Sequence, residues 1–309
     1  MDTHMKRALA CLATLLIVTL ALAVPATEGL QQQLKVDRED TNPWTSLDLK
    51  NRPENFQFAI VTDRTGGHRP GVFPSACRKL NLLQPEFVMS VGDLIEGYTE
   101  DRDQLDKEWA EFNGFVDGLE MPFFYTAGNH DISNMAMLPI WQNQFGRTYY
   151  HFVYHDVLFM VLNSEDPPGS KPANIGEEQL AWAAQVLAEN TEVRWTVVFL
   201  HKPMWQYGDG ANWSKVEAML GERPRTIFAG HHHRYAVHRQ GKWSYYALAT
   251  TGGGSKLEGP AQGRFDHVVW VTMTPDGPRL ANLLLDGILS EDPVAEASLV
   301  GDRESSAEK

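Results

Sequence analysis

The sequence predicts a layered α/β protein, and three observations support this fold class. From Phe56 onwards, short apolar runs alternate with amphipathic stretches, as strands and helices alternate in such proteins. Apolar residues make up 43% of the 309 residues, enough to build a core of good size. Several apolar runs end in Asp, Asn or His, and open α/β sheets place their ligands outside the carboxyl ends of the strands.

The expected elements follow one another along the chain. Strands are predicted at 58–61, 87–91, 123–125, 197–200 and 227–229. Amphipathic helices are predicted over 104–119 and 177–187. The runs 149–154 and 157–162 flank His155-Asp156 as the two strands of a hairpin would. Further β-rich runs lie at 243–248, 267–272 and 280–285.

The N-terminus has the features of a signal peptide. Lys6-Arg7 precede an apolar run from Ala8 to Val24, and small residues follow. Cleavage is expected after Ala23 or Ala26. An uncleaved membrane anchor is the alternative, but the run is on the short side of the roughly 20 residues that span a bilayer. We therefore expect an exported protein, periplasmic or secreted, whose mature chain does not span the membrane.

The remaining chain divides into three expected parts. Residues 27–55 are polar and read as an irregular lead-in, 56–289 form the main domain, and 290–309 form an acidic flexible tail. Outside the signal peptide Cys77 is the only cysteine, so an intramolecular disulfide is excluded. We expect Cys77 to be a buried thiol on a helix.

The charge limits the partners of the protein. A formal net charge of −13 argues against nucleic acid or an anionic membrane as the main partner, because both would repel the chain. A small-molecule or phosphorylated substrate is compatible with this charge. The sequence does not indicate an oligomeric state.

Five predicted strands end in residues that commonly bind metal ions. The endings are Asp63, Asp93, Asn129-His130-Asp131, His201 and His231-His232-His233. If these strands share a sheet edge, their ends converge on one crevice. A single histidine or aspartate is more often structural, but five coincident endings indicate a metal centre.

The ordered motifs "GDLIE", "AGNHD", "FLHKP" and "AGHHH" resemble those of the calcineurin-like metallophosphoesterase superfamily, and the resemblance covers about 56–285. It implies a four-layer α/β/β/α sandwich. It also implies a metal-dependent phosphoesterase with two divalent or trivalent ions, for which manganese, iron or zinc suits a ligand set without thiolate.

The resemblance also implies a role for each residue. Asp93 bridges the two metals, Asp63 and His233 bind the first, and the ligands of the second are Asn129, His201 and His231. His130 is expected off the metals, as a general acid or a stabiliser of phosphate charge. Asp131 is expected to orient the His130 ring. In an extended segment His232 would point away from its two neighbours.

The first motif departs from the family pattern, because Asp63-Arg64-Thr65 has threonine where Asp-x-His is usual. Thr65 could complete the first shell through its hydroxyl or a water, or His68 could reach back over two glycines. A weakly bound first metal is the third possibility. Arg64 and Arg69 are candidates for contacts to phosphate.

Two loops are expected near the substrate, and one residue concerns the type of metal centre. The segment 205–213 contains two tryptophans and is a candidate substrate wall, while 250–255 is expected to be a turn close to the site. Glu96 stands where purple acid phosphatases have tyrosine, so their purple iron chromophore is not expected.

The leading hypothesis is an exported phosphohydrolase that cleaves phosphomonoesters or phosphodiesters with a water activated by two metals. The alternatives are a nucleotidase or cyclic-nucleotide-type phosphodiesterase, which a base-stacking platform at 205–213 would favour, and a non-catalytic binding module with a weakened first metal site.

Overall fold

The computed structural model describes residues 40, 44–46, 52 and 54–288. The predicted signal peptide, most of the lead-in and the acidic tail lie outside the described residues. The chain divides into two units, 1–51 and 52–309, and all the elements below belong to the second. None of the helices in the described part is both long and apolar enough to cross a membrane.

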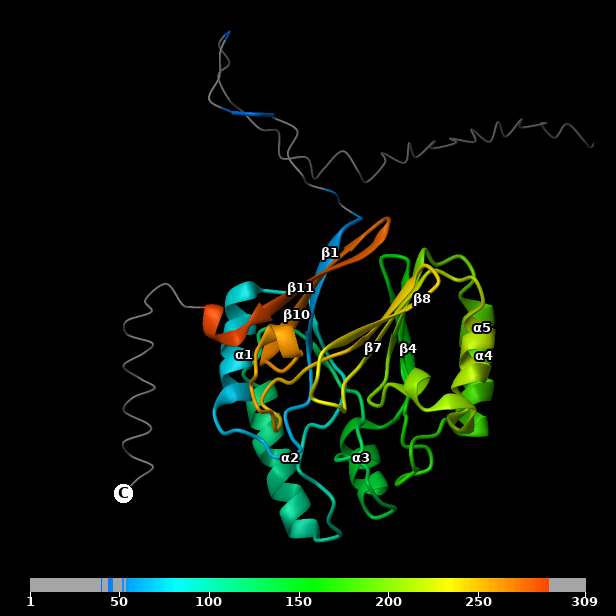
Figure 1. The fold of residues 1–309 in the computed structure, drawn as a ribbon. Coiled ribbons are helices and arrows are strands. Elements are labelled where there is room, and N and C mark those ends of the chain that lie inside the picture. Colours follow the sequence, from blue (N-terminus) through cyan, green and yellow to red (C-terminus); the bar gives the residue numbers. More distant parts are fainter. Residues whose placement is uncertain (1–39, 41–43, 47–51, 53, 289–309) are drawn as a thin grey trace, which may run out of the picture. The chain divides into compact units, whose positions relative to one another are not determined.

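Two β-sheets lie at the centre of the second unit (Figure 1). The strand order of the five-stranded sheet is β11 (Gly277–Leu284), β10 (His267–Thr274), β1 (Phe56–Val61), β2 (Val88–Ser90) and β3 (Phe123–Phe124). That of the six-stranded sheet is β4 (Tyr150–Tyr154), β5 (Val157–Val161), β6 (Trp195–Phe199), β7 (Arg225–Ala229), β9 (Trp243–Ala247) and β8 (Ala236–Gln240). In each sheet the strands that precede the predicted ligands are parallel neighbours, so their carboxyl ends share an edge.

Helices cover the outer face of each sheet, as Figure 1 shows. The helices beside the five-stranded sheet are α1 (Val72–Leu83), α2 (Arg102–Val116) and α3 (Met137–Phe145). Those beside the six-stranded sheet are α4 (Glu177–Glu189) and α5 (Trp213–Leu220). Short 3₁₀ turns lie at 204–206, 208–211, 260–262 and 285–287.

Three apolar cores hold these layers together. Along β1, Phe58 and Ile60 pack between the two sheets, whereas Ala59 and Val61 pack against the helices. β5 divides in the same way, with Phe159 between the sheets and Leu158 facing α4 and α5. Because side chains alternate across a strand, each sheet buries both faces. This arrangement confirms the predicted α/β/β/α sandwich.

Most predicted elements are present, and the differences have local causes. The hairpin turn at His155 and Asp156 has φ angles of 45° and 57°, as a two-residue turn with left-handed residues requires. Strand β8 escaped prediction because it is a fully exposed edge strand without alternation. Helix α5 escaped prediction because its 8 residues are few for a helical period to emerge.

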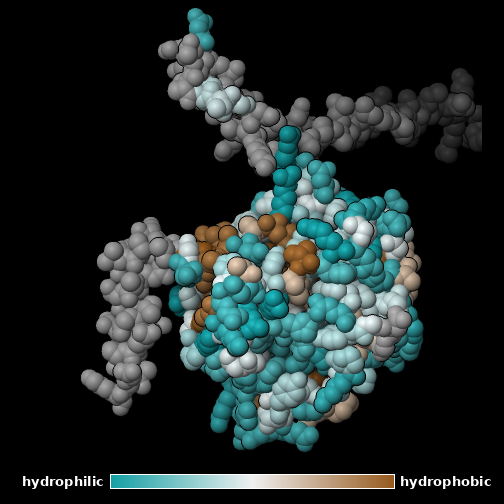
Figure 2. All heavy atoms as spheres, viewed as in Figure 1, coloured by the Kyte–Doolittle hydropathy of each residue, from teal (hydrophilic) through white to brown (hydrophobic). Residues whose placement is uncertain are grey.

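Cys77 lies on α1 and is buried, as predicted. The visible face of the molecule is mainly hydrophilic, and apolar residues gather near β10 and β11 (Figure 2), where Leu284 is exposed.

Candidate metal centre

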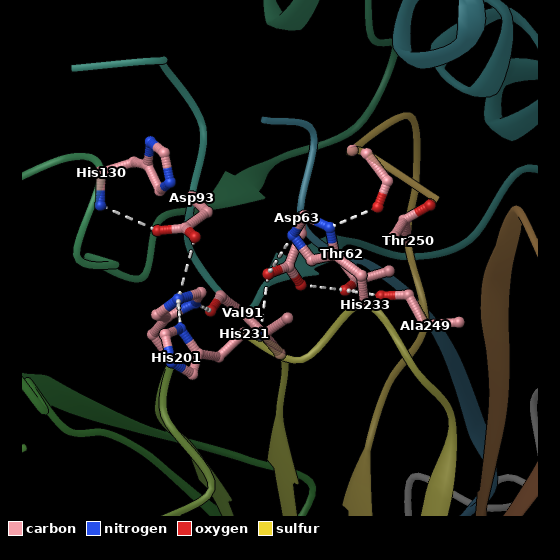
Figure 3. Close-up of polar contacts among 12 residues, drawn as sticks. Thr62, Asp63, Val91, Asp93, His130, His201, His231, His233, Ala249 and Thr250 are labelled. Carbon is pink, nitrogen blue, oxygen red and sulfur yellow. Dashed lines mark hydrogen bonds and ion pairs between the residues drawn. The ribbon is translucent and has the colours of Figure 1, made fainter. Parts of the chain in front are cut away.

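Strand ends from both sheets meet at one place (Figure 3). Asp63 follows β1 and Asp93 follows β2 in the first sheet. His201 follows β6, and His231 and His233 follow β7 in the second. These five side chains form two groups, Asp63–Asp93–His233 and Asp93–His201–His231, in each of which the ligand atoms lie within 4.8 Å of one another. Asp93 belongs to both groups, which is the arrangement expected of a bridging carboxylate.

His201 lies at the centre of the second group and is fully buried. Its Nδ1–H donates to the Val91 carbonyl at 2.9 Å, which leaves the Nε2 lone pair facing the other ligands. Nε2 lies 3.0 Å from Asp93 Oδ2, 3.0 Å from Asn129 Oδ1 and 3.2 Å from His231 Nδ1. In the neutral ring these four atoms all present lone pairs to one another, and a cation would satisfy them.

The first group is fixed in a similar way. The His233 Nδ1–H donates to the Gly254 carbonyl at 2.7 Å, so Nε2 faces Asp63 Oδ1 at 3.4 Å. The Asp63 carboxylate also accepts hydrogen bonds from the His231 amide at 2.7 Å and the Thr62 hydroxyl at 2.6 Å. A histidine whose second nitrogen donates to a backbone carbonyl is the usual form of a metal ligand.

The electrostatics of the two groups also fit a cation. Burial would raise the pKa of Asp63, but His233 and His201 hold it well below its usual range. Burial would lower the pKa of His201, but Asp93 outweighs this effect and raises it to about 9. Burial and the charge on His201 lower the pKa of His231 to about 3, so this ring keeps its lone pair. In the metal-free protein, bound protons must therefore neutralise the negative charge of the two buried carboxylates, Asp63 and Asp93.

Two glycines allow the strand ends to approach the carboxylates. A Cβ at Gly128 would collide with the side chain and amide of Asp93, and one at Gly230 would collide with Asp63 Oδ2. The glycines in "AGNHD" and "AGHHH" are thus required by close packing at the site.

His130 is held beside the metal groups without belonging to either. Its amide donates to Asp93 Oδ1 at 3.0 Å, and its Nδ1–H donates to the Glu96 carbonyl at 2.6 Å. Nε2 is therefore the ring atom that remains for a substrate. A Cβ at Gly66 would lie 3.3 Å from His233 Nε2 and 3.5 Å from His130 Nε2, which places both imidazoles beside the same glycine.

Asp131 does not orient the His130 ring, contrary to the sequence prediction. One of its carboxylate oxygens accepts the amides of Asp93 and Gly128 at 2.9 and 2.7 Å. The other accepts the amides of Leu94 and Ile95 at 2.8 and 3.2 Å. The adjacent histidine turns to Glu96 instead. Asp131 therefore holds the backbone of the "GDLIE" and "AGNHD" loops together.

Tyr98 is a site residue that the sequence analysis missed. Its hydroxyl accepts the Asn129 Nδ2–H at 3.0 Å, which turns Asn129 Oδ1 towards His201. Its ring lies edge-on to His130 at 4.7 Å between centroids. Tyr98 has a φ of 50°, an uncommon conformation for a residue with a side chain. Its position five residues after Asp93 gave no signal of this contact.

Thr65 of the first motif is buried, and the nearby His68 faces Glu96. His68 contacts Glu96 Oε1 through its amide at 2.8 Å and through Nδ1 at 2.9 Å, and it belongs to neither metal group. Thr65 Oγ1 is buried and makes no hydrogen bond of ordinary geometry with the described residues. Burial would raise the pKa of Glu96, but the nearby Thr65 hydroxyl and the contacts of His68 lower it to about 2.

Both arginines of this loop are bound by other residues of the protein, which argues against the predicted contacts to phosphate. Arg64 is buried and bonds to Glu111 and to the Leu94 carbonyl on the α2 side. Arg69 bonds to Asp266 and to the Gly253 carbonyl. Arg64 thus links its loop to α2, and Arg69 links two loops.

The two tryptophans of the segment 205–213 do not form the predicted substrate wall. Trp213 is 4% exposed in the core under α5, and the Trp205 ring packs against Tyr245 at 5.4 Å between centroids. In this segment Tyr207 comes towards the histidines, with its ring 6.2 Å from that of His232. By contrast, the turn 250–255 does approach the site, because the Gly253 amide donates to the Asp63 carbonyl at 3.0 Å.

The histidine triplet reaches the two groups by a turn. His231 and His233 have φ angles of 75° and 49°, so the segment is not extended and strand alternation does not apply. Their rings still join different metal groups, while His232 is exposed. The positions of these three rings fit the prediction that His231 and His233, but not His232, face the metals. The reason given for it, the alternation of side chains in an extended segment, does not apply here.

A protein-family model matches the part of the chain that carries these residues. The model of the family described as calcineurin-like phosphoesterase matches residues 56–235, which is more than half of the chain. This chain belongs to the calcineurin-like phosphoesterase family. The match includes all the residues of the two metal groups.

Curated relatives share part of their length with the chain. The mouse serine/threonine-protein phosphatase CPPED1 is 29% identical over 180 residues, which cover 52% of this chain and 57% of the mouse protein. The human CPPED1 is 27% identical over 220 residues, which cover 62% of this chain and 65% of the human protein. The chain thus spans less than two thirds of these relatives.

Solved structures share the fold of this calcineurin-like phosphoesterase. A dimetal phosphatase from Danio rerio aligns over 74% of this chain and 99% of its own, with a TM-score of 0.55 and 14% identity. The purple acid phosphatase PPD1 from yellow lupin aligns over 76% and 52%, with a TM-score of 0.57 and 14% identity. At such identities the likeness concerns the fold alone.

Proposed function

We propose that this protein is an exported metal-dependent phosphohydrolase that acts on phosphomonoesters at a two-metal centre. The observation that carries the proposal is the pair of ligand groups that share Asp93, with lone pairs converging on the centre of each. Membership of the calcineurin-like phosphoesterase family supports the same reaction class.

The residues divide between two ions in this proposal. Asp63 and His233 would bind one, Asn129, His201 and His231 the other, and Asp93 both. The buried Thr65 hydroxyl, which makes no hydrogen bond of ordinary geometry with a described residue, is our candidate for the remaining place in the first shell, directly or through a water. When bound, the ions would neutralise phosphate charge and lower the pKa of a coordinated water. Manganese, iron and zinc all suit oxygen and imidazole ligands.

His130 would act on the leaving group. Its Nδ1–H is committed to the Glu96 carbonyl, so only Nε2 can exchange a proton with a substrate. A protonated Nε2 would donate to the departing oxygen or stabilise the charge on phosphate. Such a residue has no use in a pure binding module, which makes that alternative weaker.

Two observations favour a phosphorylated protein or a small phosphomonoester without a nucleobase over a nucleotide. The curated relatives are serine/threonine-protein phosphatases. The two tryptophans of 205–213 do not form the base-stacking platform that would favour a nucleotidase, because Trp213 is buried in the core and Trp205 packs against Tyr245. The natural substrate would then be a phosphorylated small molecule or protein.

The test is hydrolysis of an aryl phosphate by purified protein loaded with manganese, iron or zinc. We expect turnover that chelation abolishes and metal restores, with about two ions per chain by elemental analysis. Asp117→Asn, an exposed change directly after α2, is the matched control and is expected to keep wild-type activity. A folded, metal-loaded protein without turnover on any phosphoester would overturn the proposal.

Export is proposed from the sequence of residues 1–26. Expression of the full chain in a host with a secretory pathway, followed by intact mass measurement, tests it. The expected product lies outside the cytoplasm and begins at Val24 or Thr27. A cytoplasmic product that retains Met1 or Asp2 would contradict export without affecting the proposed reaction.

A further inference from the structure

An open cavity of about 330 Å³ lies beside the metal centre. Its lining consists of the histidine triplet 231–233 together with Gly254, Ser255, Lys256 and Arg264. The lining therefore combines a ligand of each metal group with two basic residues. Its volume is at the lower end of the range of small-molecule sites.

The turn before Lys256 is fixed relative to the metal ligands. The Gly254 carbonyl accepts the His233 Nδ1–H at 2.7 Å, and the Gly253 amide donates to the Asp63 carbonyl at 3.0 Å. A Cβ at Gly254 would lie 2.5 Å from the Gly66 carbonyl, so the two loops are in close contact. Lys256 follows two residues later, so its backbone continues directly from this anchored turn.

The charge of the two basic residues is only partly neutralised. Arg264 pairs through Nε with Glu258 at 3.2 Å. Lys256 is exposed and forms no ion pair with a residue in the described part of the chain. Local positive charge in a chain with a net charge of −13 favours an anion in this cavity.

We propose that this cavity binds a second anionic group of the substrate, so that the preferred substrates carry a carboxylate or another phosphate besides the phosphate that is cleaved. The inference rests on the proposed function, because the cavity lining includes a ligand of each metal group. Lys256 is the specificity-determining residue, since its ammonium attracts carboxylate and phosphate alike. Among the described residues that line the cavity, only the histidines carry a ring that could stack on a neutral ring system.

The experiment compares three substrates on one ring: phenyl phosphate, 4-carboxyphenyl phosphate and 1,4-phenylene bisphosphate. The second distinguishes a carboxylate and the third a phosphate as the favoured group. We expect wild type to prefer the charged substrates in kcat/KM and Lys256→Gln to reduce that preference about 3- to 10-fold. Turnover of phenyl phosphate should fall less than that of the charged substrates, and metal content should not change. Lys107→Gln, an exposed change on α2, controls for the lost charge, and Lys256→Arg should retain the preference.

A binding measurement separates this inference from the proposed reaction. Calorimetry of phenylphosphonate and 4-carboxyphenylphosphonate, which are not hydrolysed, should show tighter binding of the second, lost in Lys256→Gln. If binding follows this pattern without turnover, the hydrolase proposal fails and the cavity inference stands. If turnover occurs but Lys256→Gln affects all substrates equally, or wild type shows no preference, the cavity inference is overturned.

Discussion

At the scale of single residues, one ring nitrogen of each of three site histidines is fixed by a hydrogen bond to the backbone. His130, His201 and His233 all donate Nδ1–H to backbone carbonyls, so their Nε2 atoms are the ones that face the centre. Two of these Nε2 atoms meet carboxylates, while that of His130 does not. In the proposed reaction, the same kind of backbone hydrogen bond would thus serve two metal ligands and one general acid.

This division predicts different outcomes for two substitutions. Asp93→Asn should remove most bound metal and most activity together, because one carboxylate serves both groups. His130→Gln should leave metal content near normal and lower kcat about 10²- to 10⁴-fold, because only proton transfer or charge stabilisation is lost. Elemental analysis and steady-state kinetics on both variants check this. Equal metal loss in the two would make His130 a ligand.

The first motif gives a second residue-scale prediction. His68→Ala should leave both metals bound, because the His68 ring faces Glu96. Thr65→Val keeps the shape of the side chain but removes the buried hydroxyl, and it should weaken one metal about 10-fold. Competition with a metal-binding dye measures both affinities. The reverse pattern, with His68→Ala the weaker binder, would assign the ligand to His68.

At the scale of elements, the sequence predicted the features that depend on residues close together in the chain. Apolar runs that end in Asp or His located β1, β2, β6 and β7, and their parallel pairing brought the ends together. Arg64 escaped correct prediction because its partner, Glu111, lies 47 residues away on α2. The turn at 231–233 escaped because left-handed φ values at histidine leave no trace in the sequence.

The loops between elements depend on Asp131 in the same non-local way. Its buried carboxylate accepts four amides, whereas an asparagine side chain there could accept fewer and would place an N–H against a donor. Asp131→Asn should therefore destabilise the metal-free protein by about 2–4 kcal/mol. Urea unfolding followed by circular dichroism measures this, with Asp117→Asn as the exposed control. A variant as stable as the control would show that these amides do not need the carboxylate.

Helix α1 makes a prediction about its cysteine. Burial raises the pKa of the Cys77 thiol to about 12, so the reactive thiolate is scarce at pH 8. In a chain with Cys11→Ser, a thiol reagent should therefore react with Cys77 only after unfolding. Absorbance of the released chromophore in buffer and in denaturant provides the comparison. Fast reaction of the native protein would mean that α1 opens readily.

At the scale of the whole molecule, the candidate metal centre lies where loops of the two sheets meet. Asp63 and Asp93 belong to loops of the five-stranded sheet, whereas the histidine ligands follow strands of the six-stranded sheet. The apolar core between the sheets holds them without metal, but two buried carboxylates remain at the edge. A cation at this edge would therefore stabilise the contact between the sheets as well as supply the reaction chemistry.

Metal should accordingly raise the thermal stability of the domain. A ligand present at 100 times its Kd adds about 2.7 kcal/mol, which for a domain of this size corresponds to a rise in Tm of roughly 5–10 °C. Differential scanning calorimetry of chelated and reloaded protein measures the shift. Asp93→Asn should lose the response, because each group then lacks its shared carboxylate, while Asp117→Asn should keep it. If wild-type protein that demonstrably contains metal melts at the same temperature after chelation, the ions do not bridge the sheets, and the ligand groups must form without their help.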